Sequence, residues 1–141
     1  MSLARCLYFS AAKPALPFWQ VTSEIVGASQ ARNERDELTG VLLAHNGWFV
    51  QCLEGLPSRL TRLLLRIGSD PRHRSMQLVE FVEAQDRRFG NWSMAHATLT
   101  PAIAPQVGSA FDPNAFSAAE LHALLGRTNL AAELELARRT A

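Results

Sequence analysis

Three side chains that can form hydrogen bonds stand at positions where the surrounding pattern predicts an apolar residue. Tyr8 lies in the run CLYF, Gln51 lies in WFVQCL, and Asn33 follows an apolar helical pattern. A buried amide without a partner costs about 1–3 kcal/mol, so Gln51 in particular requires one. One planar ligand, apolar in body and rimmed by hydrogen-bonding groups, would satisfy all three residues. We therefore expect Tyr8, Gln51 and Asn33 to converge on such a ligand.

Each of these residues also has a simpler interpretation when it is taken alone. A tyrosine in a strand is commonly a core aromatic residue whose hydroxyl bonds to a neighbour. An asparagine near a helix end commonly tolerates an unusual backbone angle. The joint pattern favours a ligand site, because all three residues, together with Arg32, are predicted to face the space between helices and a sheet.

A first strand and a helix would position Tyr8 and Asn33. The strand is predicted from Leu3 to Phe9, and the helix begins at Pro17, where the missing N–H costs nothing. Four turns are indicated by apolar residues at helical spacing. The same helical face then continues with Ser29, Arg32 and Asn33. The apolar residues that define the face are Phe18, Val21, Ile25 and Ala28.

A hairpin would position Gln51. The run from Leu38 to Ala44 is rich in strand-forming residues, and Asn46-Gly47 after it is a strong signal for a two-residue turn. This turn would place Leu42 opposite Gln51, and paired residues share a face of the sheet. Gln51 would then share its face with Leu42, Ala44, Phe49 and Leu53, whereas the other face would carry Val41, Leu43, Trp48, Val50 and Cys52. Both faces are apolar, so we expect both to be covered.

The remaining elements complete an α+β fold. A second helix is predicted from Pro57 to Gly68, a fourth strand around Met76 to Val82, and a fifth from Trp92 to about Ala97. This order predicts a ferredoxin-like βαββαββ sandwich with a five-stranded mixed sheet and both helices on one face. Residues 1–100 would form this domain. Residues 101–141 would form a linker and two C-terminal helices over the other face, with Ser117 and Glu120 as a capping box.

The bulk properties exclude several functional classes. The chain has 141 residues and a net charge of +1, so no overall field favours nucleic acid or anionic lipid. No run approaches the ~18 apolar residues that a membrane span needs. Cys6 and Cys52 lie in apolar runs and are interpreted as reduced, buried residues, and the histidines show no metal-site spacing. We therefore expect a cytoplasmic protein without a metal or membrane partner, with nucleic acid disfavoured.

Two further groups of residues have open interpretations. The basic clusters at Arg72–Arg74 and Arg87-Arg88 are either solvated loop charges or contacts to a phosphate tail. Trp92 and Met94 share a face of the last predicted strand, and they are either core residues or residues that move when the site's hydrogen bonds change.

The order and spacing of these pieces resemble the BLUF family of blue-light sensors that bind FAD. The resemblance runs from about Leu3 to Leu99. Its motifs are the strand Tyr8, the segment SQARN, LTG at Leu38 to Gly40, Gln51 before LEG, the loop DPRH and the segment RRFGNWSM. The resemblance implies that the flavin ring lies between the two helices that cover one face of the sheet.

The resemblance also implies roles for individual residues. Ile25 and Ile67 would flank the ring, Asn33 would hold its carbonyl and imide edge, and Arg32 would lie beside the pyrimidine end. Ser29 and the loop residues Asp70, Arg72 and His73 are the further candidates for cofactor binding. Gln51 would bridge Tyr8 and the flavin, and light would draw an electron and a proton from Tyr8 while Gln51 rearranges. No substrate would be turned over.

The resemblance leaves the output of the signal to a partner. The chain is expected to be a short, stand-alone member that forms a homo-oligomer and signals in trans, through the last strand with Trp92 and Met94 and through the C-terminal helices. Two features depart from the family pattern. The loop before the first helix is about one residue longer, and Arg32 stands where some relatives carry histidine.

Other classes of protein compete with this interpretation. An RNA-recognition module shares the βαββαβ order, but it would display basic and aromatic residues on the sheet face opposite the helices. That face offers Trp48 without an adjoining Lys or Arg. A non-photoactive, ferredoxin-like module that binds another small molecule is the main alternative. A thiol or acid–base enzyme is disfavoured because no Cys–His or carboxylate pair is suitably placed.

Overall fold

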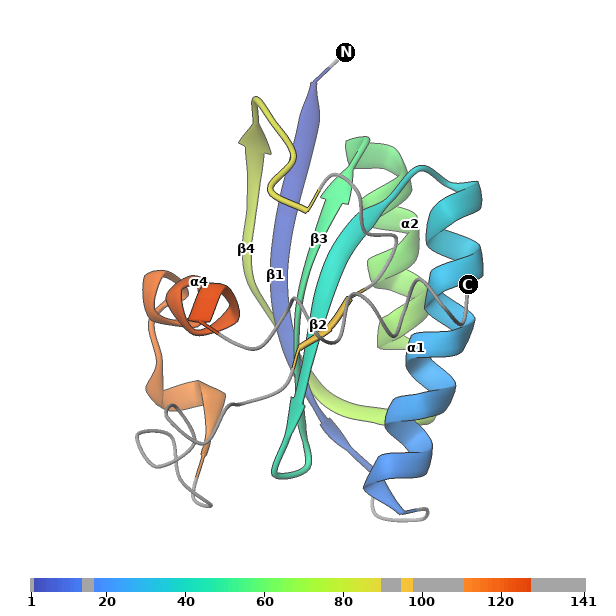
Figure 1. Cartoon of the computed structure of the whole chain (residues 1–141), viewed down its shortest axis with the longest axis vertical. Coiled ribbons are helices and arrows are strands. Elements are labelled where there is room, and N and C mark those ends of the chain that lie inside the picture. The colour runs from blue at the N-terminus through green and yellow to red at the C-terminus, as the bar shows by residue number, and fades with distance from the viewer. Residues whose placement is uncertain (1, 14–16, 90–94, 98–110, 128–141) are drawn as a thin grey trace.

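The computed structural model describes residues 2–13, 17–89, 95–97 and 111–127, which form an α+β sandwich. Strands β1 to β4 are antiparallel to their neighbours, whereas the short β5 runs parallel to β2, in the order β4-β1-β3-β2-β5. Helices α1 and α2 cover one face of the sheet and α4 lies on the other (Figure 1). The strands are β1 (Leu3–Ala12), β2 (Thr39–His45), β3 (Trp48–Gly55), β4 (His73–Ala84) and β5 (Ala95–Ala97). The helices are α1 (Phe18–Arg35), α2 (Pro57–Gly68), the 3₁₀ turn η1 (Pro113–Ala115) and α4 (Ala118–Arg127).

The predicted α+β architecture is confirmed, with differences of detail at the C-terminal end. The main sheet has four long antiparallel strands. The described part of the fifth begins at Ala95, whereas the sequence predicted a start at Trp92. Trp92 and Met94 lie outside the described residues, as does the second C-terminal helix that was expected from Asn129.

The β2–β3 hairpin has the register that its turn predicts. Asn46 and Gly47 both adopt positive φ angles, 53° and 81°, as a tight two-residue turn requires. Leu42 is therefore paired with Gln51, and Ala44 with Phe49.

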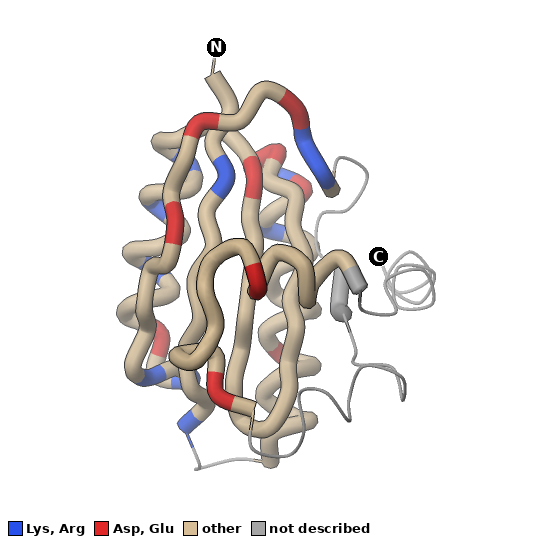
Figure 2. Tube along the Cα trace, turned by 90° about the vertical axis from the view of Figure 1, so that its left-hand side faces the viewer, with Lys and Arg blue, Asp and Glu red and all other residues tan. Residues whose placement is uncertain are grey.

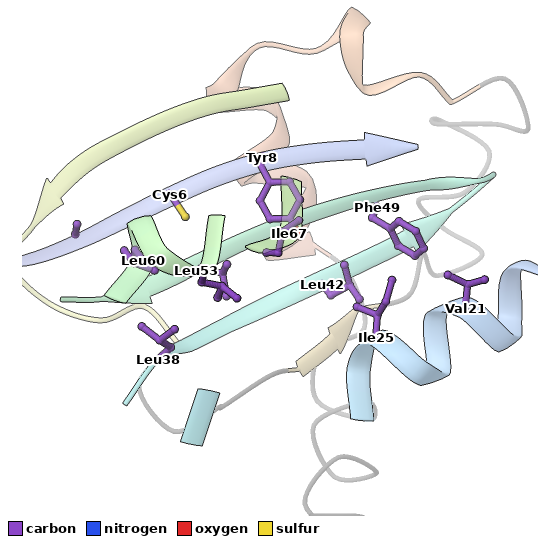
Figure 3. Close-up of a cluster of buried hydrophobic side chains, with 12 residues drawn as sticks. Cys6, Tyr8, Val21, Ile25, Leu38, Leu42, Phe49, Leu53, Leu60 and Ile67 are labelled. Atoms are coloured by element: carbon purple, nitrogen blue, oxygen red, sulfur yellow. The ribbon is translucent and has the colours of Figure 1, made fainter. Parts of the chain in front are cut away.

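Both faces of the sheet are buried, as the two apolar faces of the hairpin predict. On the face of α1 and α2, the core includes Tyr8, Leu42, Phe49 and Leu53 (Figure 3). On the opposite face, the core joins the strands to the C-terminal segment through Leu7, Phe9, Val41, Leu43, Val50, Cys52, Phe111, Leu121, Leu124 and Leu125. The face that an RNA-recognition module would expose is therefore covered.

Helix α1 carries a polar end on its buried face. Val21, Ile25, Ser29 and Asn33 are buried and follow one another at intervals of four residues, so they form one stripe along the helix. The stripe faces the sheet, and its last two members are polar. In α2 the buried stripe is apolar throughout and consists of Leu60, Leu63 and Ile67.

Helix α4 is fixed to the rest of the fold by hydrogen bonds as well as by its apolar side. Ser117 and Glu120 form the predicted capping box, in which the Ser117 N–H donates to Glu120 Oε1 at 2.9 Å and the Glu120 N–H donates to Ser117 Oγ at 3.1 Å. His122 lies 2.9 Å from Glu80 of β4 and 3.3 Å from Arg88. The helix crosses the strands on the face away from α1 and α2 (Figure 2).

Strand β4 is a long edge strand with an irregular register. It was predicted from Met76 to Val82 and extends from His73 to Ala84. Its pairing with β1 shifts twice, between Leu7 and Tyr8 and between Phe9 and Ala11 of β1. The shifts are β-bulges, which insert extra residues on one strand. Three apolar residues of β4 stay exposed, namely Leu78, Phe81 and Val82.

A buried carboxylate, Glu54 at the end of β3, organises the loop that follows β4. Glu54 is 1% exposed and accepts hydrogen bonds from Arg5 Nε at 3.0 Å and Thr39 Oγ1 at 3.1 Å. It also accepts from the backbone N–H groups of Arg88 at 2.7 Å and Phe89 at 2.9 Å. Multiple donors compensate the cost of burying the charge, so this network fixes the loop against the end of β3.

Arg87 belongs to the same network. Its guanidinium donates to Thr39 Oγ1 at 2.9 Å and to the carbonyl oxygens of Glu54 at 3.2 Å and Glu37 at 2.8 Å. Arg87 therefore has a structural role, which neither interpretation drawn from the sequence, a solvated charge or a phosphate contact, had predicted.

We predict that Glu54→Gln lowers the free energy of unfolding by about 3 kcal/mol, because Arg5 then loses its buried counter-charge and an NH₂ group meets backbone donors. Urea denaturation followed by circular dichroism measures the change. Glu83→Gln removes an exposed carboxylate from β4 and serves as the control, with an expected change within about 0.5 kcal/mol. Equal losses in the two variants would contradict the role assigned to Glu54.

Candidate functional site

A cavity of about 550 Å³ lies between α1, α2 and the sheet. All of the residues predicted to bind a cofactor line it except Asn33, which is fully buried on α1 next to Arg32. Tyr8, Ile25 and Ile67 extend from three different elements on this side of the sheet (Figure 3). The lining residues are Tyr8, Ile25, Ala28, Ser29, Arg32, Gln51, Arg66, Ile67, Ser69, Asp70, Pro71, Arg72 and His73.

Tyr8 and Gln51 form a hydrogen-bonded pair in the wall of this cavity. They are directly opposite each other in the antiparallel pairing of β1 with β3, and the Tyr8 hydroxyl donates to Gln51 Oε1. Both side chains are buried, with exposed fractions of 1% and 2%. An amide that accepts through its oxygen retains two N–H groups on its nitrogen, so Gln51 can link Tyr8 to an acceptor.

Burial keeps the Tyr8 phenol neutral. The loss of solvation raises the pKa of Tyr8 well above its ordinary value; the charge of Cys6 in its ionised form adds to the rise and Arg32 opposes it. A phenolate in this apolar wall would be costly, and so would the radical cation that loss of an electron alone would leave. The pair can therefore donate one electron and one proton together.

Arg32 and Ser29 supply polar groups at the α1 side of the cavity. Arg32 Nη2 donates to Ser29 Oγ at 3.4 Å, while Arg32 Nε is buried and has no hydrogen-bond partner. Burial lowers the pKa of Arg32, and the neighbouring Arg66 lowers it further. A buried donor without a partner is costly, so this edge fits a ligand that carries acceptor atoms.

Asp70, Arg72 and His73 form the loop side of the cavity. Arg72 holds Asp70 with two parallel hydrogen bonds, Nε to Oδ1 at 3.0 Å and Nη2 to Oδ2 at 2.7 Å. Burial acts to raise the pKa of Asp70, but the hydrogen bonds and the charge of Arg72 outweigh it and hold the pKa below its ordinary value. The charge of Arg72 is therefore largely neutralised within the loop.

His73 ties this loop to β1. Its Nδ1 lies 2.7 Å from the hydroxyl of Ser10, and its Nε2 lies 4.0 Å from Asp70 Oδ2. His73 is 7% exposed, and burial lowers its pKa despite the opposing charge of Asp70. Ser10 is fully buried and does not line the cavity, so the Ser10–His73–Asp70 set is not an accessible nucleophile with its base.

The cysteines and the possible metal ligands among the described residues offer no competing site. Burial raises the pKa of both Cys6 and Cys52 to about 12, and the two thiols lie in the cores on opposite faces of the sheet. Within the described residues, no group of three or more His, Cys, Asp or Glu side chains could hold a metal ion. None of the helices in the described ranges is long and apolar enough to cross a membrane.

The comparison with known families agrees with this geometry. The family model described as "BLUF: Sensors of blue-light using FAD" matches residues 3–95. The chain belongs to the BLUF family. BLUF proteins are flavin-using blue-light sensors, and the matched range contains the whole cavity.

Individual relatives show the same domain in different settings. The photoactivated adenylate cyclase subunit beta of Euglena gracilis is 39% identical over 77 residues, which are 54% of this chain and 9% of the relative. The blue light- and temperature-regulated antirepressor BluF of Escherichia coli (strain K12) is 34% identical over 71 residues, 50% of this chain and 18% of the relative. The chain thus spans less than a fifth of the length of these curated relatives.

Two solved BLUF structures are similar over most of their length. The dark-state structure of BlrB has a TM-score of 0.76 and 33% identity, and the alignment covers 93% of this chain and 97% of that chain. The photo-activated state of BlsA has a TM-score of 0.79 and 24% identity over 88% of this chain and 92% of that chain, a likeness that shows a shared fold.

Four lining residues of this BLUF cavity were not identified from the sequence. They are Ala28, Arg66, Ser69 and Pro71. Arg66 directly precedes Ile67, and the apolar stripe of the helix drew attention away from it. Its position one helical turn after Arg62 is a signal that could have identified it, because residues four apart share a helix face.

We predict that the free energy of unfolding falls as the pH drops from 7.5 to 5. Burial lowers the pKa of His73 in the folded state. Below the ordinary histidine pKa of about 6.5, the unfolded chain therefore binds more protons than the folded chain, and this binding stabilises the unfolded chain. The contribution of Asp70, whose pKa is also lowered, is lost only below about 3.8. Urea titrations at several pH values measure the slope of the free energy of unfolding against pH.

His73→Gln should make this slope shallower, because the buried imidazole is gone. Gln85→Asn, at an exposed residue that does not titrate, is the control and should leave the slope as in the wild type. A wild-type slope in His73→Gln would show that another group carries the pH dependence.

Proposed function

We propose that this chain is a blue-light photoreceptor that holds the isoalloxazine ring of FAD in the cavity between α1 and α2. The observation that carries the proposal is the buried hydrogen bond from Tyr8 to Gln51 in the cavity wall. In this proposal Tyr8 is the electron and proton donor and Gln51 is the switch. The family description supports FAD as the flavin.

The size and lining of the cavity support this ligand. A volume of about 550 Å³ falls within the ~300–1,000 Å³ of ligand pockets. Ile25 and Ile67 offer apolar contacts to the two sides of a planar ring. Ser29, Arg32 and Gln51 offer hydrogen bonds to its polar rim. Asn33, which lies on the same stripe of α1 as Ser29, would hold the carbonyl and imide edge.

The photochemistry follows from the residue types. When bound, the flavin absorbs blue light and supplies an excited state that accepts an electron and a proton. Tyr8 would release both together, because loss of only one of them would leave a charge in a buried site. While Tyr8 lacks this electron and proton, the Gln51 amide flips or tautomerises. The electron and the proton then return to Tyr8, and the amide keeps its new arrangement. In its new arrangement Gln51 would donate to the polar rim of the bound flavin, and this hydrogen bond would shift the flavin absorption to the red.

The signal would leave the cavity along β3 and the segment after β4. Gln51 and Glu54 lie three residues apart on β3, and Glu54 accepts hydrogen bonds from the backbone of Arg88 and Phe89. That loop leads directly into the segment with Trp92 and Met94, which we propose as the relay. The output would pass through α4 and the C-terminal region to a protein partner in trans, in a homo-oligomeric assembly.

The photochemical proposal is tested with Tyr8→Phe and Gln51→Leu. Each variant should purify with bound flavin but lose the reversible red shift after blue illumination, because the donor or the switch is missing. Tyr8 is the sole tyrosine of the chain, so any transient tyrosine signal in infrared spectra of the wild type must come from it. Absorption spectra before and after illumination measure the red shift.

The matched control is Trp48→Phe. Trp48 packs against Phe9 on the face of the sheet opposite the cavity, so its replacement should leave the red shift intact. A full photocycle in Tyr8→Phe would rule out Tyr8 as the donor. A wild-type protein that purifies without flavin and binds none would instead favour a ferredoxin-like module for another small molecule.

A further inference from the structure

Large apolar side chains stay exposed along one edge of the sheet. Leu65 of α2 is 70% exposed, and Leu78 and Phe81 of β4 are 49% and 39% exposed. Strand β4 is the outermost strand, next to β1 (Figure 1). Helix α2 contacts β4 as well as β1 and β3, so the helix borders the same edge.

Leu78 and Phe81 lie on the face of the sheet that carries α2. Leu78 is paired with Tyr8 and Phe81 with Cys6, and both partners belong to the core beneath the helices. Paired residues of neighbouring strands share a face. The bulge between Leu7 and Tyr8 in this pairing allows two residues of β4 that are three positions apart to share that face.

Leu65 reaches the same edge from the helix. A Cβ atom at Gly68 would lie 3.7 Å from the sulfur of Met76, so this side of α2 is turned toward β4. Leu65 precedes Gly68 by three residues, and residues three apart are neighbours on a helix surface. The start of α2 and the end of β4 both lie where β1 begins, so the two elements run in opposite directions. Leu65 lies about 4.5 Å back along α2 from Gly68 and Leu78 about 7 Å beyond Met76, so both lie at a similar height along the edge.

The two elements that border these apolar side chains carry opposite unpaired charges. Helix α2 has three arginines and no acidic residue. Arg62, three residues before Leu65, is exposed and makes no hydrogen bond or ion pair with the described residues. Glu83, two residues after Phe81, is paired with Ala4 and therefore lies on the same face. It too is exposed and has no such partner in the described part of the chain.

This edge is complementary to a second copy of itself. A two-fold rotation can set α2 of one copy against β4 of the other, and the symmetry then makes the reverse contact as well. Arg62 of each copy would meet Glu83 of its partner, around a centre formed by Leu65, Leu78 and Phe81. An apolar centre with a polar rim is the usual arrangement of a protein interface.

A helix suits this edge better than a strand does. The bulges of β4 break the ladder of donors and acceptors that an added strand needs, but a helix needs no such ladder. A second β4 strand would also bring the carboxylates of Glu80 and Glu83 toward their equivalents, whereas α2 brings Arg62. The second copy is therefore expected to cover β4 with its helix.

We propose that the α2–β4 patch, which consists of Arg62, Leu65, Leu78, Phe81 and Glu83, is the contact surface of a two-fold symmetric dimer of this chain. The inference rests on the homo-oligomer of the proposed function and names its surface. It does not depend on flavin, because none of the five residues lines the cavity.

The test measures the mass of the full-length protein by sedimentation velocity in the dark, over about 1 to 200 μM, a range that includes the micromolar dissociation constants of small interfaces. The wild type should be a dimer at the upper concentrations. Leu65→Gln/Phe81→Gln should raise the dissociation constant about a hundredfold or more, because each dimer loses four buried apolar side chains. Circular dichroism checks that this variant is folded.

Charge reversal tests which residues face each other. Arg62→Glu and Glu83→Arg should each raise the dissociation constant about tenfold, because each dimer then contains two like-charge pairs. The double variant Arg62→Glu/Glu83→Arg should recover a dissociation constant near that of the wild type. An equal mixture of the two single variants should also dimerise, because both pairs are then of opposite charge.

Two variants on α1, which packs against β2, are the matched controls. Trp19→Gln removes an apolar side chain that is 71% exposed, and Arg35→Glu reverses the charge of a side chain that is 69% exposed. Both should keep the dissociation constant of the wild type. A loss of dimer in either control equal to that in the patch variants would overturn the surface assigned here.

The remaining outcomes separate this inference from the proposed photochemistry. A monomeric wild type at all concentrations, a dimer that the patch variants leave unchanged, or single variants that lose the dimer without recovery in the double variant would each overturn the surface. A particle larger than a dimer would do so as well, because a two-fold contact closes after two copies. A wild type that dimerises through this patch but binds no flavin would overturn the photoreceptor and leave the surface intact.

Discussion

The pairing register between β1 and β3 is the constraint on which the site depends. It sets Tyr8 directly opposite Gln51, so a phenol and an amide from residues 43 positions apart meet in one wall. The register matters because a slip by one residue would exchange the two faces of the strand completely. Leu7 and Phe9 would then enter the cavity, and Tyr8 would be buried beneath α4. The same hydrophobic contacts that stabilise the sheet therefore also align the hydrogen-bonding pair.

The two faces of the sheet border different environments, and β3 contributes side chains to both. On one face, Gln51 borders a cavity lined by apolar and cationic residues. On the other, Cys52 and Val50 pack in the dry core beneath α4. Glu54 ends the strand and holds the backbone of the next loop, while His122 joins α4 to that loop through Arg88. Gln51 therefore shares a strand with Glu54, which holds the loop that contacts α4. In the proposed photoreceptor, this continuity would couple the cavity to the C-terminal region.

Local patterns were sufficient to predict the fold and most of the site. Asn46-Gly47 determined the hairpin register, and the alternation of the strands placed Tyr8 and Gln51 on one face. What could not be predicted depends on contacts between segments that are distant in sequence. The burial of Glu54 depends on Arg5 and on the loop at Arg88, and nothing near Glu54 in the sequence indicates either. The neutralisation of Arg72 depends on how the loop after α2 places Asp70. The bulges that lengthen β4 likewise arise from its fit to β1.

The irregular edge of the sheet has a consequence for behaviour at high concentration. A straight twelve-residue edge strand with exposed Leu78, Phe81 and Val82 would be a template for uncontrolled stacking of neighbouring molecules. The two bulges in the pairing of β4 with β1 increase the local twist and break the even ladder of donors and acceptors that an incoming strand would need. The bulges therefore act together with the charged residues of β4, Arg74, Glu80 and Glu83, to disfavour such stacking.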